Sequence, residues 1–448
     1  MFFRLIGAWL VLFCLIVGGS SAKADAVPAG AASLLAWNDS DPAAADRLSA
    51  IALRQNPQDA RALLVRALLA RSLGQLDDAL AFAMAAYRSG ELSALRFDAA
   101  LLAADVLTRQ DRFTRAQIWL RRADQIAPDD KRRTLARRSY REVASRNPLA
   151  VRLRFGVSPS SNVNNGAETT EIEIGGLPFQ LDDSGLQLGG YEAETGVSLA
   201  YRLSEQTTHK TEILGEIFYR KVWLNSEAMA LAPNAKGSDF DYAVVAGGLR
   251  HDRMIWPELG LTTLSGVVGQ TWYGGEELAL WGDAQLKQTV QHGEDRAWRF
   301  GVSFRLESRM DDAKNDSYAV GLNAEHLRLT SDGGRYNLGA FLRDTRSDSA
   351  TIDNLAVGSS VARQFKRIGP VQPSIKVTAE SRDYRKWVAT AGGRRDNSLG
   401  LQLDFIWPDV SYYGFSPLAV FSTRRTWSNV DIYDRSEVSL GLSVVSRF

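Results

Sequence analysis

The residue types that most often carry catalysis are thinly spread along this chain. Its four histidines, His209, His251, His292 and His326, lie far apart and show no metal-ligand spacing. No serine or aspartate is marked as a nucleophile by a neighbouring base, which a hydrolase would require. The pairs of glycines follow no phosphate-binding fingerprint and are interpreted as turns or strand ends. We therefore predict no enzyme, no bound metal and no cofactor.

The start of the chain predicts export. Residues 1–4 (MFFR) precede an apolar run at 5–17, and residues 22–24 (AKA) follow it, which is the pattern of a secretory signal peptide. We expect the signal peptide to be 1–24, with cleavage after Ala24; a buried core helix is the alternative. The single cysteine, Cys14, would be lost with this segment, so the mature chain would form no disulfide and no thiolate site. A net charge of +1 predicts no nucleic-acid partner.

The candidate functional side chains are charged residues that alternate with apolar ones. In 298–307, aromatic and aliphatic side chains take one parity while charged and small residues take the other, and 191–203 shows a similar alternation. This pattern is expected of a strand with lipid on one face and water on the other. The alternative is a hydrated, salt-bridged wall without a specific role. The candidates for the lumen are Glu192, Glu194, Arg299, Arg305 and Glu307.

About fourteen antiparallel strands between 149 and 448 would position these side chains. No stretch after the signal peptide approaches the roughly 18 apolar residues of a membrane helix, so a membrane-spanning chain would have to cross as strands. Short links follow the even-numbered strands and several longer links follow the odd-numbered ones, which places short turns at the periplasmic rim and long loops at the outer face. The expected strands are 150–157, 189–204, 207–223, 239–255, 257–273, 275–291, 296–309, 315–330, 334–346, 353–367, 371–385, 395–407, 413–427 and 433–448.

The last strand is expected to close the barrel. Residues 437–448 have one apolar face and one mostly small or polar face, and they end on Phe448. Pairing of the last strand with the first removes both sheet edges, which a bilayer requires. A strand of a soluble sheet is the alternative.

The first third of the mature chain is helical in character. From 31 to 147 it is rich in Ala, Leu and Arg, and Gly74, Ala79, Ala83 and Ala86 recur about 37 residues later as Asp111, Ala116, Leu120 and Ala123. Small residues at these places allow paired helices to pack closely. The pattern resembles two to three degenerate tetratricopeptide repeats, which form surfaces for extended peptides or partner proteins. We expect a helical domain at 25–148 in the periplasm; an undifferentiated helical bundle is the alternative.

A basic helix is predicted at 129–146. Asp129 and Asp130 suit its start and seven Lys or Arg side chains follow. Two interpretations stay open: a basic collar that contacts cargo or lipid phosphate, and a solvated helix face.

A polar segment, 158–166, follows the first strand and reads as a turn-rich loop. Its Ser161, Asn162, Asn164 and Asn165, together with the signal peptide, the degenerate repeats and the barrel, resemble the surface lipoprotein assembly modifier (Slam) family. That resemblance implies a helical-repeat, or α, domain followed by a transmembrane β-barrel of fourteen strands in the outer membrane.

The resemblance also implies a function without a chemical step. The protein would help to move lipoprotein or secreted protein cargo across the outer membrane. Its other partners would be outer-membrane lipid and the assembly machinery that inserts such barrels. The alternatives are a polysaccharide-export porin and a general diffusion porin, each with a helical-repeat domain.

Overall fold

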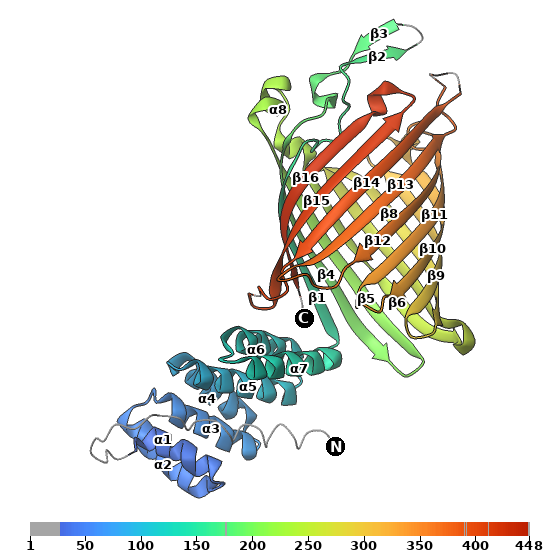
Figure 1. Cartoon of the computed structure of the whole chain (residues 1–448). Coiled ribbons are helices and arrows are strands. Elements are labelled where there is room, and N and C mark those ends of the chain that lie inside the picture. Colours follow the sequence, from blue (N-terminus) through green and yellow to red (C-terminus); the bar gives the residue numbers. More distant parts are fainter. Residues whose placement is uncertain (1–26, 175–176, 389, 391, 411, 447–448) are drawn as a thin grey trace. The chain divides into compact units, whose positions relative to one another are not determined.

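The structure is a computed structural model that describes residues 27–448 except 175–176, 389, 391, 411 and 447–448. The chain forms a helical unit, which extends to Asn147 and also includes Tyr412–Gly414, and a barrel unit, which begins at Pro148 (Figure 1). The expected signal peptide (1–24) and the terminal Phe448 lie outside the described residues.

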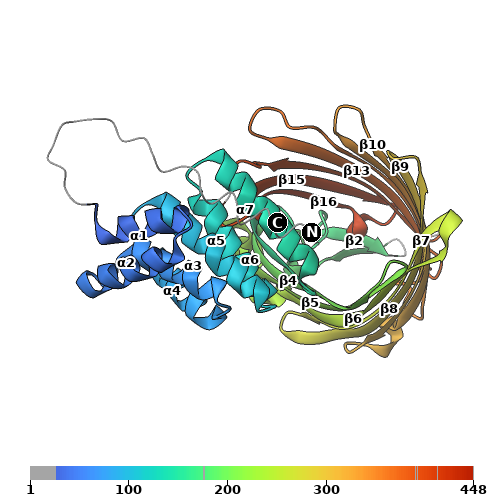
Figure 2. The ribbon, with the colours of Figure 1, turned by 90° about the horizontal axis from the view of Figure 1, so that it is seen from below.

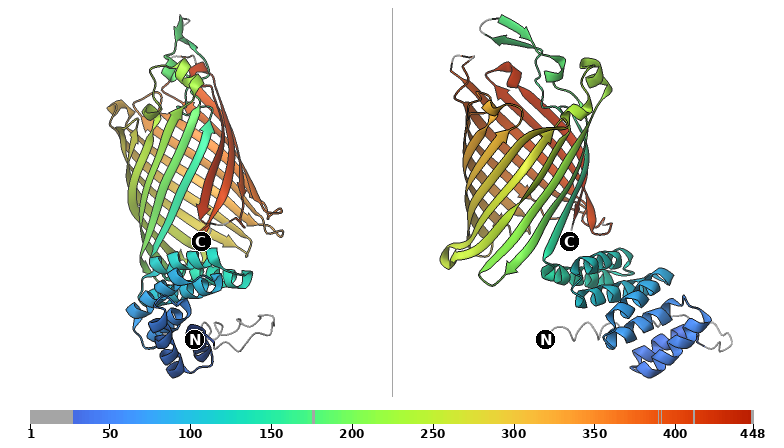
Figure 3. Two further views of the ribbon diagram at one scale, coloured as in Figure 1. Left: turned by 90° about the vertical axis from the view of Figure 1, so that its left-hand side faces the viewer. Right: turned by 180° about the vertical axis from the view of Figure 1, so that it is seen from behind.

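Seven helices make up the described part of the helical unit, and consecutive helices pack against one another (Figure 3). Asp41, Asp59 and Asp129 each cap a helix by accepting a backbone N–H, as short acidic side chains do at helix starts. The helices are α1 (Ala29–Asn38), α2 (Pro42–Gln55), α3 (Ala60–Ser72), α4 (Leu76–Ser89), α5 (Ser93–Arg109), α6 (Phe113–Ile126) and α7 (Asp130–Arg146).

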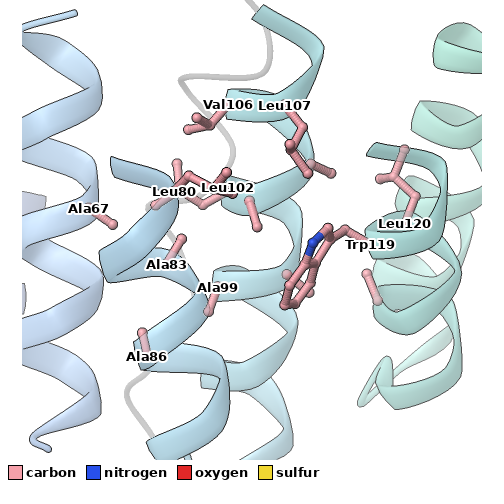
Figure 4. Packing of buried hydrophobic residues seen from close by; sticks show 14 of the residues in the cluster. Ala67, Leu80, Ala83, Ala86, Ala99, Leu102, Val106, Leu107, Trp119 and Leu120 are labelled. Atoms are coloured by element: carbon pink, nitrogen blue, oxygen red, sulfur yellow. The ribbon is translucent and has the colours of Figure 1, made fainter. Parts of the chain in front are cut away.

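The positions of the predicted recurrence fall on α4 and α6 and on the turns that precede them. Ala83 and Ala86 of α4 and Leu120 of α6 are buried in one hydrophobic core (Figure 4). The turns before these helices also correspond, because Gly74 and Asp111 both adopt a left-handed backbone, with φ of 76° and 55°. Glycine takes this conformation without strain and aspartate tolerates it better than most residues. The recurring positions therefore include the turns before α4 and α6 and buried positions on both helices.

Fourteen antiparallel strands form one closed barrel, which Figure 2 shows as a ring. This confirms the predicted fold class. The strands are β1 (Leu149–Ser160), β4 (Gly190–Glu205), β5 (His209–Leu224), β6 (Tyr242–Trp256), β7 (Gly260–Tyr273), β8 (Glu276–His292), β9 (Arg296–Arg309), β10 (Ser317–Leu329), β11 (Arg335–Ser347), β12 (Asn354–Gln364), β13 (Gln372–Tyr384), β14 (Arg394–Ile406), β15 (Phe415–Ser428) and β16 (Arg435–Ser446).

Strand β1 closes the ring by pairing with β16 on one side and β4 on the other. It continues to Ser160, which corrects the prediction that a loop begins at Ser158. Proline has no backbone N–H and usually ends a strand. Pro159 is accommodated here because the β1–β16 register skips Ser158 and Pro159, while Pro159 still lies opposite Tyr191 of β4.

The outer surface of the barrel is a continuous apolar belt. Val302, Leu322 and Leu342 lie side by side on β9, β10 and β11, and each has between 42% and 51% of its surface exposed. Leu286 of β8 and Val357 of β12 extend the same row. A belt of this kind is stable against hydrocarbon and unfavourable against water, so the barrel is of the membrane-spanning type.

The two ends of the barrel differ in the length of their connections. At the end where β1 begins, the links 206–208, 257–259 and 293–295 are short. At the other end, 161–189 and 225–241 are long (Figure 3). The longer of these carries an unpredicted hairpin of β2 (Glu171–Ile174) and β3 (Leu177–Gln180), and the other contains α8 (Ser226–Leu231). Short 3-10 turns are η1 (Asp183–Gly185), η2 (Gly237–Phe240), η3 (Pro257–Leu259), η4 (Ala313–Asn315) and η5 (Asp431–Tyr433).

Candidate functional site: the lumen wall and the outer cap

Strand alternation places all five lumen candidates on the inner face of the barrel. On β9, Trp298, Phe300 and Phe304 are exposed on the outer face, so Arg299, Arg305 and Glu307 have the opposite parity. On β4, the exposed Tyr191 and Leu199 likewise place Glu192 and Glu194 inside. The inner positions are only partly exposed, because neighbouring side chains along the wall cover them.

The β9 candidates make ion pairs within the wall. Arg305 lies 3.1 Å from Glu307, and its guanidinium carbon lies 4.4 Å from the centre of the Trp281 ring of β8. Arg299 lies 3.0 Å from Glu325 of β10. Arginine held between a carboxylate and an aromatic face keeps its charge at the water boundary while its stem packs on the wall.

The β4 candidates belong to a second, separate group. Glu192 lies 3.6 Å from Arg220 of β5, and Glu194 is directly opposite Arg220 in the strand register. Strands β5 to β8 lie between β4 and β9 in the ring. The structure therefore places the five candidates in two patches of the wall and does not bring them together in one site.

Further ion pairs on the inner wall were missed by the sequence analysis. Glu212 of β5 pairs with Lys210 and with Arg250 of β6, and Glu380 of β13 lies between Arg382 and Arg343. Strict alternation is the signal that could have revealed them. It is obscured on β5 and β6, where apolar residues take both parities.

The loop motif forms a compact hydrogen-bonded turn. The Asn162 side chain is buried; its Oδ1 accepts the Gly166 N–H at 2.8 Å and its Nδ2 donates to the Gly166 carbonyl at 3.1 Å. Asn164 joins the two ends of the loop, because its Nδ2 donates to the Leu186 carbonyl at 2.6 Å and its Oδ1 accepts the Leu188 N–H at 3.0 Å. Asn165, which follows Asn164 in the sequence, adopts a left-handed φ of 55°.

Ser161 and Glu168 fix the same loop across the β1–β16 junction. The Ser161 N–H donates to the Val438 carbonyl of β16, and the Ser161 hydroxyl accepts the Val438 N–H, both at 3.0 Å. Glu168 pairs with Arg425 of β15. Hydrogen bonds from Ser436 and Arg425 hold the pKa of Glu168 below its usual value, so this ion pair persists at neutral pH.

The two long connections at this end of the barrel, residues 161–189 and 225–241, pack together, and we call them the cap. Val163 and Leu188 from the first loop and Phe240 from the second pack against Val222 on the inner wall of β5. Gly237 comes so close to this wall that a Cβ there would meet the Val222 carbonyl oxygen at 2.4 Å. The cap is thus seated on the wall by a small hydrophobic core of its own.

The described residues outside the cap and the wall show few arrangements that could do chemistry. His209 and His251 have ring centres 6.0 Å apart, and His326 lies beside Trp298 on the outer face. Within the described ranges no three or more His, Cys, Asp or Glu side chains gather as a metal site. No described helix combines the length and the apolar character needed to cross a bilayer.

Comparison with known proteins yields structural likeness alone. Neither protein families nor curated sequences give a match. A bacterial polysaccharide outer membrane secretin is 9% identical, with a TM-score of 0.34, over 66% of this chain and 98% of its own. Pseudomonas putida OprB is 8% identical, with a TM-score of 0.40, over 69% and 96%. The outer membrane channel DcaP of Acinetobacter baumannii is 14% identical, with a TM-score of 0.35, over 66% and 96%.

The barrel's own strand pairing and lipid-facing belt place it among β-barrels of the outer-membrane type.

Proposed function

We propose that this protein is a translocation factor that delivers partner proteins, either surface lipoproteins or secreted proteins, across the outer membrane. The helical unit would lie in the periplasm and hold cargo, and the barrel would provide the passage. The observation that carries this proposal is the joining of a helical unit to a closed barrel through only two residues between α7 and β1, Asn147 and Pro148. A receptor tethered so closely keeps bound cargo at a high effective concentration near the barrel.

The outer cap is the second feature that we relate to a controlled passage. Its core of Val163, Leu188, Phe240 and Val222 gives it the packing of a folded element that is attached to the inner wall. In this proposal the cap keeps the outer mouth restricted while no cargo passes.

The resemblance to the Slam family is retained as part of this proposal. It rests on the order of the units and on Ser161, Asn162 and Asn164, which the structure shows at the base of the cap. In this proposal the motif acts by shaping the cap, and cargo contacts fall to the helical unit and the wall.

The test is a surface-display assay in the native host. Candidate lipoproteins and secreted proteins are followed by protease treatment of intact cells, with the chain deleted and with it restored. We expect deletion to lower surface exposure of particular cargo while its total cellular amount stays the same. An unrelated outer-membrane barrel, followed in the same cells, controls for a general assembly defect. Loss of polysaccharide export with cargo display unchanged would instead favour the porin alternative.

A further inference from the structure

The seven basic side chains of α7 fall into two groups. Four of them have carboxylate partners within the helical unit. The pairs are Arg132–Asp129 at 2.9 Å, Arg133–Asp130 at 2.8 Å, Arg137–Asp124 at 2.8 Å and Arg146–Asp111 at 3.9 Å.

The other three, Lys131, Arg138 and Arg141, are exposed and have no carboxylate within ion-pair distance among the described residues. Their spacings of seven and three residues put them on one stripe of the helix, since about 3.6 residues make a turn. Leu135 lies beside this stripe and is 37% exposed. Glu142, the nearest carboxylate in sequence, forms no ion pair with Arg138 or Arg141 in the structure. The stripe is therefore a cationic surface whose charge is left uncompensated.

The chain itself keeps the Arg141 end of this stripe near the start of β1. Helix α7 ends at Arg146 and β1 begins at Leu149, and the first large exposed apolar residue of β1 is Val151. With a rise of about 1.5 Å per residue, Arg141 lies roughly 8 Å from the end of its helix. Lys131, at the other end of the stripe, lies roughly 22 Å from the end of the helix. All three cations can therefore meet the headgroup layer together only when α7 lies along the membrane surface, which is the orientation that the proposal requires.

Asn147 prevents this tether from lengthening. Its side-chain amide donates to Gln117 Oε1 at 2.7 Å and to Thr114 Oγ1 at 3.1 Å on α6, and its backbone N–H donates to the Val143 carbonyl. The last turn of α7 is therefore fixed to its neighbour up to the residue before Pro148.

We propose that Lys131, Arg138 and Arg141 bind the phosphate groups of anionic phospholipids at the membrane surface where β1 begins. Each Lys or Arg near an anionic surface contributes a favourable interaction of about 1 kcal/mol, or roughly fivefold. The exposed Leu135 is suited to the boundary between headgroups and acyl chains. The stripe orients the helical unit and does not depend on the identity of any cargo.

The experiment uses the full chain in lipid nanodiscs, with Cys14→Ser and Thr134→Cys so that one fluorophore sits on the stripe. Two nanodisc samples are compared, both with phosphatidylcholine as the host lipid. Each contains the same mole fraction of a lipid with a quencher on its headgroup, which is phosphatidylglycerol in one sample and phosphatidylcholine in the other. We expect several-fold stronger quenching by the anionic lipid at low salt, and its loss near 1 M salt, where the Debye length is about 3 Å. The triple variant K131Q/R138Q/R141Q should quench equally with both lipids, and each single variant should retain part of the preference.

A matched control removes three other exposed cations that also lack an ion pair within the described chain: Arg47, Arg54 and Arg61 of α2 and α3. The variant R47Q/R54Q/R61Q should retain the full preference for anionic lipid. Equal quenching by both lipids in the parent protein would overturn the proposal, as would a control that loses the preference as completely as the stripe variant. Quenching relieved by a soluble polyglutamate peptide, without any lipid preference, would assign the stripe to acidic protein cargo instead. Because no cargo enters the experiment, its outcome is independent of the translocation proposal.

Discussion

Asp98 is a carboxylic acid held in the helical unit where burial disfavours its charge. Burial raises the pKa of Asp98 from 3.8 to about 6, with Arg132 nearby acting in the opposite direction. The folded state therefore binds more protons than the unfolded state between these two values. Protonated Asp98 therefore contributes its full stability to the folded state below about pH 4. This contribution to the free energy of unfolding is lost as the pH rises through about 6 and Asp98 ionises.

We expect Asp98→Asn to stabilise the helical unit at pH 7.5 by on the order of 2 kcal/mol and to have little effect at pH 4. The measurement is the urea midpoint of the helical circular-dichroism signal of the full chain in detergent at both pH values. An equal gain at pH 4 and pH 7.5 would contradict the assigned pKa, because it would show a packing effect in place of a titration.

Gly166 is the residue on which the loop motif closes. A Cβ at Gly166 would meet the Leu186 carbonyl oxygen at 2.2 Å, whereas a Cβ at Gly185 in the same cap would have its nearest contact at 3.9 Å. We expect Gly166→Ala to loosen the cap by about 1–3 kcal/mol and Gly185→Ala to leave it intact. Limited proteolysis of the folded barrel in detergent tests this through cleavage within 161–189. Equal cleavage rates for the two variants would show that the turn tolerates a side chain at Gly166.

The sequence marks these polar residues but does not reveal their partners. Serines and asparagines after a strand predict a turn. The bonds of Asn164 go to Leu186 and Leu188, and Asn162 also reaches the Ser436 carbonyl. Such contacts depend on the return path of a long loop and on barrel closure, so local pattern cannot predict them.

The helical elements rest on close packing of small residues. Ala83 of α4 is fully buried between helices, while Ala81 on the same helix is exposed. We expect Ala83→Leu to destabilise the helical unit by about 1–3 kcal/mol, since added methyl groups have no space. Ala81→Leu should be close to neutral. Chemical unfolding of the full chain, followed by the helical signal, measures both, and equal effects would show that the interface can expand.

Strands could be predicted accurately where apolar and polar residues alternate strictly, and less accurately elsewhere. The expected 296–309 coincides with β9, because aromatic and charged residues there alternate without interruption. The hairpin β2–β3 was not predicted, since two strands of four residues inside a loop give too short a pattern. The two patches of lumen candidates also escaped prediction, because their separation depends on how many strands lie between β4 and β9.

At the scale of the whole molecule, the two faces of one strand meet different solvents. Val302 lies near the middle of β9 on the outer face and Ser303 lies next to it on the inner face. We expect Val302→Arg to destabilise the barrel in lipid vesicles by about 2–4 kcal/mol, the cost of a cation near the bilayer midplane. Ser303→Arg places the same charge against water and should cost far less. Reversible urea unfolding in vesicles compares the two, and equal losses would mean that the assigned faces are wrong.

The pairing that completes the ring joins residues far apart along the chain. The Ser443 hydroxyl donates to the Phe155 carbonyl across 288 positions of sequence. Until the last strand is available, β1 has an unsatisfied row of backbone donors and acceptors that could template mispairing. The helices contact mainly their sequence neighbours, so they can pack as soon as the next helix is available. We infer that the helical unit folds early, while the barrel remains prone to mispairing until its final strand, β16, pairs with β1.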